Sequence, residues 1–334
     1  MPLNFPCSVA DFMAFALTDP EHGYYTTQQP FGRSGDFITA PEVSQLFGEM
    51  IAVWCVEQWQ KLGCPNAFVL AELGGGKGTL MADVLRTTRK IAPAFFAAAT
   101  LAMVEISPIL QAAQQQALQP FAKGQWHTTI DSIPQDTPLL LFANEFFDAL
   151  PIEQYIKTAE GWHERGVDTT GFVAGAPVTP PALFLDAPEG SILEHSPATT
   201  AIFTQLCERL QNQKGAMLII DYGYADHALG DTLQAVKNHQ YVPVLENVGK
   251  ADITAHVNFA ALEDIAVEKK LSPTLSTQRD FLHQYGITTR LAGLLKNAAA
   301  AQQEELMSQY QRLVGVEGMG ALFKVLCVSG GSRF

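Results

Sequence analysis

Cysteine is scarce in this chain, and the few cysteines do not form the pairs that metal sites or disulfide frameworks need. The five are Cys7, Cys55, Cys64, Cys207 and Cys327, with no Cys-x-x-Cys motif among them. The eight histidines are scattered, and none has a nearby Cys or His at the spacing of zinc ligands. Odd, widely spaced cysteines are typical of reduced, mostly buried thiols. We therefore expect no metal site and a cytoplasmic location.

Basic residues and long apolar runs are also missing. The chain has 21 Lys and Arg against 34 Asp and Glu, a formal net charge of −13, and the basic residues form no cluster. Binding to nucleic-acid phosphates needs clustered basic side chains, so a general nucleic-acid binder is excluded. No segment approaches the roughly 18 apolar residues of a membrane span, and the first residues lack the pattern of a signal peptide. We expect no nucleic-acid partner and no membrane insertion.

Short apolar segments alternate with helical patterns from residue 68 onward. Strands are predicted at residues 68–73, 101–105, 138–143 and 215–221. Continuous apolar strands that alternate with helices are typical of a parallel sheet covered on both faces, so the fold class is α/β. The sequence pattern changes between the third and the fourth of these strands. A hairpin pattern and a stretch rich in Pro, Gly and Ala there indicate an insertion at about residues 152–214.

Helical patterns precede the first strand and follow the last of these segments. Ser8, with an acidic residue three positions later, predicts a capped helix that ends before Pro20. Pro41 begins a long predicted helix that stops near Gly63. The tail is predicted to contain a strand near residues 271–277, then helices, and a last strand at 321–328.

A glycine-rich loop joins the first strand to a helix. Residues 72–79 read Glu-Leu-Gly-Gly-Gly-Lys-Gly-Thr, and glycines at such a junction let the backbone approach a ligand at a helix N-terminus. A dinucleotide fingerprint needs a glycine where Thr79 stands, and a P-loop needs Ser or Thr where Gly78 stands. The spacing Glu-Leu-Gly-x-Gly-x-Gly looks like the first motif of class I methyltransferases, whose cofactor S-adenosylmethionine carries no phosphate.

Acidic residues stand at the ends of two of these strands. Glu72 precedes the glycines, and its carboxylate suits the ammonium and sulfonium groups of S-adenosylmethionine. Glu105 ends the second strand and is placed to accept both ribose hydroxyls. The same acidic position serves NAD in dehydrogenases, so Glu105 supports a nucleotide without deciding between the two cofactors.

Asn144, Glu145 and Asp148 follow directly on the predicted strand 138–143. Residues just past the carboxyl ends of strands line the ligand crevice of an open α/β sheet. There the two carboxylates and the amide could hold a nitrogen nucleophile, accept its protons and align it with a transferred methyl group. If the nucleophile is an arginine, carboxylates are needed even more, because its guanidinium stays protonated near neutral pH. The alternative is a helix N-terminus capped by Asn144, and both interpretations can hold together.

Five segments in order carry a family resemblance: residues 35–49, 72–80, 144–151, 231–235 and 251–259. Together they resemble the MidA-like methyltransferases, bacterial relatives of the mitochondrial arginine methyltransferase that assists assembly of respiratory complex I. The resemblance implies a class I methyltransferase (Rossmann-like) fold with a mostly parallel seven-stranded sheet and helices on both faces. It also implies an N-terminal helical cap, residues 1–66, on a methyltransferase core, residues 67–334, that carries the insertion.

The resemblance further implies a function and a site. It implies S-adenosyl-L-methionine as cofactor and a protein substrate, namely arginine in a complex I subunit, converted to symmetric dimethylarginine. The implied cap residues that close over the cofactor are Gly35, Asp36, Thr39 and Pro41. The full set of candidate cofactor residues is Gly35, Asp36, Thr39, Pro41, Glu72, Gly74, Gly76, Gly78, Thr79, Glu105 and Asn144. The candidate catalytic residues are Glu145, Asp148, Asn144 and His256.

Some alternatives stay open at this point. His256, expected near the substrate mouth, could equally be a hydrogen-bonded core histidine. A non-catalytic assembly factor that binds S-adenosylmethionine is a second function, and an NAD-dependent Rossmann oxidoreductase is a third, disfavoured by Thr79. The oligomeric state is open, a homodimer included.

Overall fold

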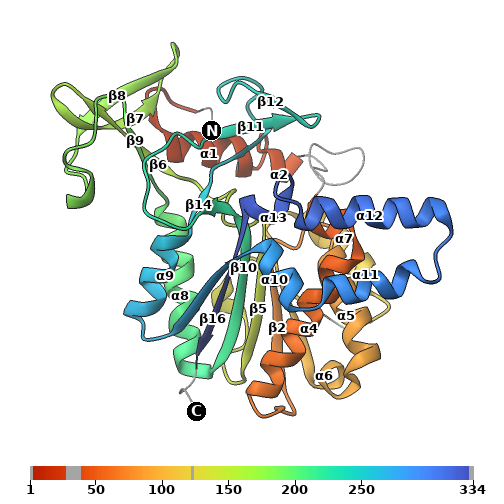
Figure 1. The fold of residues 1–334 in the computed structure, drawn as a ribbon. Helices are drawn as coiled ribbons and strands as arrows, with labels where there is room; N and C mark the ends of the chain where they lie inside the picture. Colours follow the sequence, from red (N-terminus) through yellow and green to blue (C-terminus); the bar gives the residue numbers. More distant parts are fainter. Residues whose placement is uncertain (1–2, 28–38, 122–123, 331–334) are drawn as a thin grey trace.

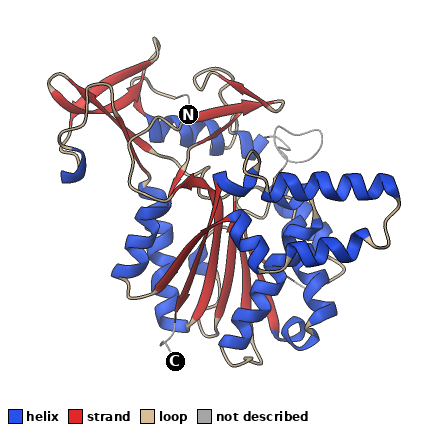
Figure 2. Cartoon of the chain, in the orientation of Figure 1, coloured by secondary structure: helices blue, strands red, loops and turns tan. Residues whose placement is uncertain are grey.

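The computed structural model describes residues 3–27, 39–121 and 124–330, and a sheet with helices on both faces lies at its centre (Figures 1 and 2). Seven strands follow one another in this sheet. In spatial order they are β15 (Ser272–Thr277), β16 (Phe323–Gly330), β10 (Gly215–Tyr224), β5 (Leu139–Asn144), β2 (Phe68–Leu73), β3 (Ala99–Val104) and β4 (Gln125–His127).

Most neighbouring strands of this sheet are parallel. The five from β10 to β4 run parallel, whereas β16 runs antiparallel to both of its neighbours. The short β14 (Val257–Asn258) also pairs parallel with β10, so the sheet has eight strands among the described residues and not the seven predicted. The predicted α/β class, with helices on both faces, is confirmed.

The strands are apolar throughout because both faces of the sheet are covered. In β5, Leu140 and Phe142 belong to one apolar cluster, and Leu139 and Leu141 belong to the other. Successive side chains of a strand point to opposite faces, so burial on both sides removes any alternation with polar residues. This explains why the pattern of the sequence reveals these strands.

Two sets of helices pack on the two faces of the sheet (Figure 1) and contribute the remaining side chains of the two clusters. The first set contributes to the cluster on one face: α4 (Gln45–Lys61), α5 (Thr79–Ile91), α6 (Pro93–Ala98), α7 (Pro108–Leu118), α10 (Gln278–Gln284), α11 (Ile287–Leu295) and α12 (Ala300–Val314). The second set covers the other face: α8 (Pro197–Gln213) and α9 (Phe259–Glu268). The short helices η1 (Ile130–Ser132), η2 (Ala182–Phe184) and α13 (Met319–Leu322) lie in connections.

A second sheet stands above the carboxyl end of the main one (Figure 1). It has five antiparallel strands: β1 (Cys7–Ser8), β6 (Glu153–Thr158), β7 (Gly161–Val167), β8 (Phe172–Pro177) and β9 (Ile192–His195). A third, three-stranded sheet consists of β11 (Gln234–Lys237), β12 (Gln240–Val242) and β13 (Asp252–Thr254). The helix α1 (Val9–Thr18) packs against residues of both small sheets.

The packing of these parts bears on the predicted division of the chain. Residues 1–66, expected to form one helical cap, contribute α1 to the cluster of the small sheets and α4 to the cluster of the main sheet. Helix α8 lies within the residue range of the predicted insertion, but it packs on the main sheet. The boundaries of the domains stay a prediction.

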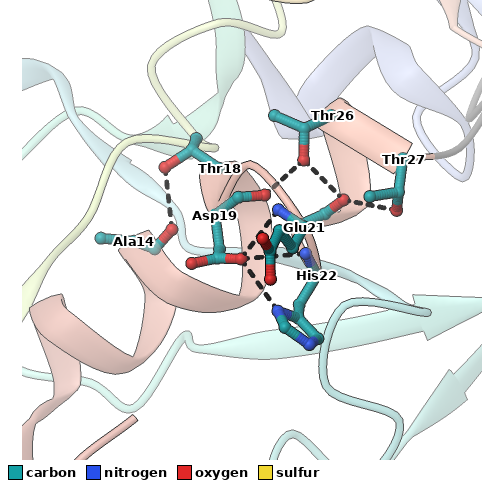
Figure 3. Close-up of polar contacts among 8 residues, drawn as sticks. Ala14, Thr18, Asp19, Glu21, His22, Thr26 and Thr27 are labelled. Atoms are coloured by element: carbon teal, nitrogen blue, oxygen red, sulfur yellow. Dashed lines mark hydrogen bonds and ion pairs between the residues drawn. The ribbon is translucent and has the colours of Figure 1, made fainter. Parts of the chain in front are cut away.

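Helix α1 begins as predicted, with Ser8 as its cap, since the Ser8 Oγ accepts a hydrogen bond from the Asp11 N–H at 3.0 Å. After the helix, the Asp19 carboxylate accepts hydrogen bonds from the backbone N–H groups of Glu21 and His22 (Figure 3). This turn leads into α2 (Tyr24–Thr27). There the Tyr25 hydroxyl donates to Asp252 Oδ1 at 2.8 Å and joins the N-terminal helices to β13.

The long helix predicted from Pro41 is divided into two. Helix α3 (Ala40–Val43) ends at Ser44, whose backbone is extended (φ −161°, ψ 139°), and α4 begins at the next residue. The Ser44 Oγ accepts a hydrogen bond from the Leu46 N–H at 3.4 Å. Serine competes for backbone hydrogen bonds and therefore starts a new helix here in place of continuing the first.

Within the described residues no helix is long and apolar enough to cross a membrane.

Candidate functional site

The glycine loop connects β2 to α5 through three left-handed residues. Gly74, Gly76 and Gly78 have φ values of 60°, 50° and 81°, and this region of backbone space favours glycine because it crowds any Cβ. Gly78 is the N-cap of α5, which starts at Thr79. The loop therefore places a helix N-terminus, a position that favours ligand binding through backbone N–H groups, at the carboxyl end of a central strand.

A cavity lies over this loop and is lined by residues from three separate segments. The predicted site residues in its wall are Thr39, Pro41, Glu72, Gly74, Gly76, Thr79, Asn144 and Glu145. Helix α3 forms one side, held by a hydrogen bond from the Ala40 N–H to Glu145 Oε1 at 3.4 Å. Gly35 and Asp36, which were also predicted to contact the cofactor, lie outside the described residues.

Glu72 brings a buried carboxyl group with one unpaired oxygen to this cavity. Its side chain is only 2% exposed, and its Oε2 has no hydrogen-bond partner in the described part of the chain. Burial, and secondly the neighbouring Glu105, raise the pKa of Glu72 to about 8. A buried acceptor without a donor fits a cationic ligand, and the ammonium group of S-adenosylmethionine is such a ligand. The residues of the loop thus fit this cofactor.

Glu105 follows β3 and does not line the cavity over the loop. Its Oε1 accepts a hydrogen bond from the Ser107 N–H at 2.9 Å, and its Oε2 accepts one from Gln114 Nε2 at 3.3 Å. Burial raises its pKa. Gly78, likewise absent from the cavity wall, packs against α7, because a Cβ there would lie 3.2 Å from Gln114 Cα.

Gln114, on α7, is a residue that sequence reasoning did not single out. Its side chain is fully buried, and its Nε2 donates to the Gly76 carbonyl oxygen at 3.0 Å as well as to Glu105. Its Oε1 accepts from Trp126 Nε1 at 2.9 Å. The amide therefore links the glycine loop to the acid at the next strand. A glutamine in a Gln- and Ala-rich helix carries no sequence signal of this role.

We expect Gln114→Ala to weaken S-adenosylmethionine binding by about tenfold, because the loop carbonyl and Glu105 each lose a buried donor. Isothermal titration calorimetry would measure the change. Gln115→Ala, at an exposed position of the same helix, is the matched control and should bind like the wild type. Equal affinities of the two variants would contradict this role of Gln114.

The segment after β5 forms a turn and not the helix N-terminus that was the alternative expectation. Glu145 has a left-handed backbone (φ 51°), which is strained for a residue with a Cβ and is concentrated at functional sites. Its N–H donates to the Ile220 carbonyl oxygen at 2.9 Å, and its Oε1 accepts from Asn144 Nδ2 at 3.1 Å. The turn thus directs the Glu145 carboxyl group into the wall of the cavity.

Asp221, on β10 three residues before the strand ends at Tyr224, supports this turn and was not predicted as a site residue. Its Oδ2 accepts hydrogen bonds from the N–H groups of Phe147 and Asp148, at 3.1 and 3.2 Å. The side chain is fully buried, and burial, with Asp148 and Glu145 nearby, raises its pKa well above the ordinary value. Its position as an acid at the end of a predicted strand was the available signal.

Three carboxyl groups are therefore crowded at this edge of the sheet. Burial, and then Asp148, raise the pKa of Glu145 to about 7, and burial raises the pKa of Asp148 to about 6. Asp148 is 5% exposed and lines neither the loop cavity nor the second cavity described next. Such groups can exchange protons near neutral pH, which is the property of a general base.

His256 lies apart from the loop cavity. It lines a second cavity beside Tyr224 and the N-termini of α8 and α9, and burial lowers its pKa. Its ring meets the Tyr222 ring edge-on, with centroids 5.4 Å apart, and its backbone N–H donates to Thr232 Oγ1 at 2.9 Å. The structure therefore brings Asn144 and Glu145 to the glycine loop but does not bring His256 there.

Within the described residues, no group of three or more His, Cys, Asp and Glu is arranged to hold a metal ion.

Comparisons with known proteins relate the chain to methyltransferases. A family model described as S-adenosyl-L-methionine-dependent methyltransferase matches residues 50–276. The protein arginine methyltransferase NDUFAF7, mitochondrial, of Danio rerio is 33% identical, with 98% of this chain and 84% of that protein covered. The Mus musculus protein of the same name is 36% identical, with 95% of this chain and 80% of that protein covered.

A solved structure is similar over nearly the whole chain. It is a COG1565 superfamily member from Burkholderia thailandensis bound to S-adenosyl-homocysteine, with a TM-score of 0.83 and 28% identity. The match covers 98% of this chain and 89% of that one.

These comparisons correct the expected location. The prediction of a cytoplasmic protein is contradicted, because the relatives from Danio rerio, Mus musculus and Homo sapiens are named as mitochondrial proteins. The prediction depended on scattered cysteines, which indicate a reducing compartment but do not single out the cytoplasm.

Proposed function

The chain belongs to the S-adenosyl-L-methionine-dependent methyltransferase family, and on this premise we propose that it methylates arginine side chains of a protein. Family membership confirms the predicted cofactor and the predicted methyltransferase activity. It also confirms the class I methyltransferase fold and decides against the NAD-dependent alternative. The choice of arginine is supported by the relatives, which are named protein arginine methyltransferases.

The observation that carries this proposal is the acidic turn beside the glycine loop. Glu145 lines the same cavity as Gly74 and Gly76, and Asp148 lies close enough to raise its pKa. A guanidinium has N–H donors and no acceptor, so paired carboxylates are the groups that bind it best. Glu145 in the wall of the cofactor cavity, with Asp148 buried close to it, therefore favours a cationic substrate nitrogen.

In the mechanism we propose, each group has a separate task. Glu72 and the glycine backbone would hold the cofactor, and Thr39, just before α3, and Pro41, on α3, would cover it. Glu105 supports the loop from outside the cavity, because Gln114 donates both to Glu105 and to the Gly76 carbonyl oxygen. Bound S-adenosylmethionine supplies an electrophilic methyl group. The carboxylates of Glu145 and Asp148 bind the guanidinium, and one of them takes the proton that the nitrogen loses on methylation. Asn144 fixes Glu145 through its hydrogen bond.

We also propose a finer substrate assignment, an arginine of a respiratory complex I subunit converted to symmetric dimethylarginine. Its support is the resemblance of the five sequence segments to MidA-like methyltransferases. No nucleic-acid partner is proposed, since the net charge of −13 disfavours one.

A radiolabel assay tests the arginine assignment. The purified protein is incubated with S-adenosylmethionine carrying a tritiated methyl group and with a lysate of cells that lack this gene. We expect tritium in methylarginine after acid hydrolysis and chromatography of the amino acids. Tritium confined to methyllysine, or absent from protein, would exclude the proposed substrate class.

Cofactor binding should depend on pH through Glu72. Because its pKa is raised to about 8, the free protein carries this carboxyl group mostly protonated near neutral pH. Binding of an ammonium group favours the carboxylate, so binding releases a proton and strengthens as pH rises. We expect the affinity for S-adenosylmethionine to rise about twentyfold between about pH 6 and pH 7.5.

The Glu72→Gln variant is the control for this prediction, because it retains the shape of the side chain but cannot titrate. It should bind more weakly at about pH 7.5 and show only the pH dependence of the ligand itself. Parallel curves for the two proteins, measured by calorimetry, would refute the role assigned to Glu72.

A further inference from the structure

Three buried polar atoms near the acidic turn have no hydrogen-bond partner in the part of the chain that the structure describes. They are Asn144 Oδ1, Asp148 Oδ1 and the hydroxyl oxygen of Tyr222. Asp148 is 5% exposed and Tyr222 is 7% exposed. Buried polar atoms in folded proteins are almost always paired, so three unpaired atoms in one place indicate a ligand that completes them.

These atoms come from two neighbouring strand ends. Asn144 is the last residue of β5 and pairs in register with Ile220 of β10, two residues before Tyr222. Asp148 is held to the same strand by the hydrogen bond of its N–H to Asp221. Asp148 and the Tyr222 hydroxyl lie close enough for each to shift the pKa of the other, and Thr254 also acts on the pKa of Tyr222. Within the described part of the chain, however, neither Asp148 Oδ1 nor this hydroxyl has a partner at hydrogen-bonding geometry.

The chemistry of the cluster indicates the kind of ligand. All three unpaired atoms are oxygens that can accept hydrogen bonds, although the Tyr222 hydroxyl can also donate one, and Glu145, Asp148 and Asp221 place carboxyl groups near them. No lysine or arginine is among the groups that shift the pKa of these acids. A guanidinium offers five N–H donors in a fixed planar arrangement and carries the charge that the cluster lacks.

We propose that the Tyr222 hydroxyl, Asn144 Oδ1 and Asp148 Oδ1 bind the N–H groups of the substrate arginine and position one nitrogen for methylation. This inference rests on the proposed arginine methyltransferase function and adds Tyr222 to it. In the step, the bond from nitrogen to the methyl carbon forms as the bond from sulfur to that carbon breaks. The nitrogen loses one proton to the carboxylate of Glu145 or Asp148, and neutral S-adenosyl-homocysteine leaves.

The Tyr222 ring is fixed independently of its hydroxyl. Its edge-on contacts with His256 and Phe323 have centroid distances of 5.4 and 5.5 Å, and its backbone pairs with Phe323 in the sheet. Removal of the hydroxyl by Tyr222→Phe therefore leaves the ring packing in place. The hydroxyl is the part of the side chain that this inference concerns.

The experiment compares Tyr222→Phe with Tyr285→Phe, whose hydroxyl bonds to Glu57 at 2.7 Å and lies outside the site. Both variants are assayed for methylarginine formation at several concentrations of lysate from cells that lack the gene, and for S-adenosylmethionine binding by calorimetry. For Tyr222→Phe we expect the rate at low lysate to fall at least about tenfold, since a hydrogen bond to a charged group is lost. The lysate concentration at half-maximal rate should rise, and cofactor affinity should stay within about twofold. Tyr285→Phe should match the wild type in both assays.

Each other outcome overturns the inference. If the wild type forms methylarginine and Tyr222→Phe does so with unchanged kinetics, the hydroxyl does not bind substrate, while the proposed function stands. If Tyr222→Phe loses cofactor affinity together with rate, Tyr222 acts on the cofactor and not on arginine. If the wild type forms no methylarginine, the proposed function fails as well.

Discussion

Gly74→Val is expected to abolish detectable binding of S-adenosylmethionine, with a loss of affinity of at least about 100-fold. Two effects act together. Gly74 has a φ of 60°, where a β-branched residue is strongly disfavoured, and a Cβ would lie 2.7 Å from Cδ2 of the Phe146 ring. The ring or the loop must move, and Phe146 is the residue next to Glu145, so the change deforms both walls of the cavity.

Gly63→Val is the control that separates the backbone strain from the steric clash with Phe146. Gly63 also has a left-handed backbone, with a φ of 82°, but nothing lies within 4 Å of the position of its Cβ. This variant should lose some stability and retain cofactor affinity, which calorimetry and thermal unfolding would measure side by side. Wild-type affinity in the Gly74→Val protein would show that the loop is not the cofactor site.

The second large effect is expected for Glu145→Gln, which should lower the rate of methyl transfer by at least about 100-fold. The amide keeps an oxygen for the hydrogen bonds from the Ala40 N–H and Asn144 Nδ2, so the turn retains its shape. It cannot accept a proton or pair with a guanidinium. Cofactor affinity should therefore change little, and single-turnover rates with tritiated S-adenosylmethionine would measure the loss.

The pH dependence of the rate adds to this test. Burial and Asp148 raise the pKa of Glu145 to about 7, so its carboxylate form, which is needed as base, accumulates as pH rises through that value. The wild-type rate should rise between about pH 6 and 8, and this rise should be missing in Glu145→Gln. Glu304→Gln, at an exposed position on α12, is the control and should keep the wild-type profile. A Glu145→Gln protein with full activity would exclude this residue as the base.

The main sheet was predictable because its strands are buried on both faces. Residues 138–143 form an uninterrupted apolar run for that reason, and the strand β5 covers almost the same residues. The pairing of β1 with β7 was not predictable, since Cys7 lies opposite Val167 and no local pattern reports a partner so distant in the chain. The break at Ser44 was missed because the apolar periodicity continues across it.

Some residues of the candidate site could likewise be predicted from the sequence, and others could not. Glu72, Gly74 and Glu145 were identifiable because each stands at the end of a strand or directly after it, where an α/β sheet binds its ligands. Gln114 and Tyr222 were not singled out, since their roles depend on contacts between elements: the bond of Gln114 to the Gly76 carbonyl, and the proximity of Tyr222 to Asp148. His256 was grouped with the acids by motif, but its place in the second cavity is a matter of packing.

The most direct measurement of the central claim is quantitative mass spectrometry of methylarginine in three matched cell lines. One line contains the wild-type protein, one lacks it, and one contains Glu145→Gln at the same level. We predict at least one arginine, in a complex I subunit under the finer proposal, that is methylated only in the wild-type line. The same methylarginine profile in all three lines would contradict the account.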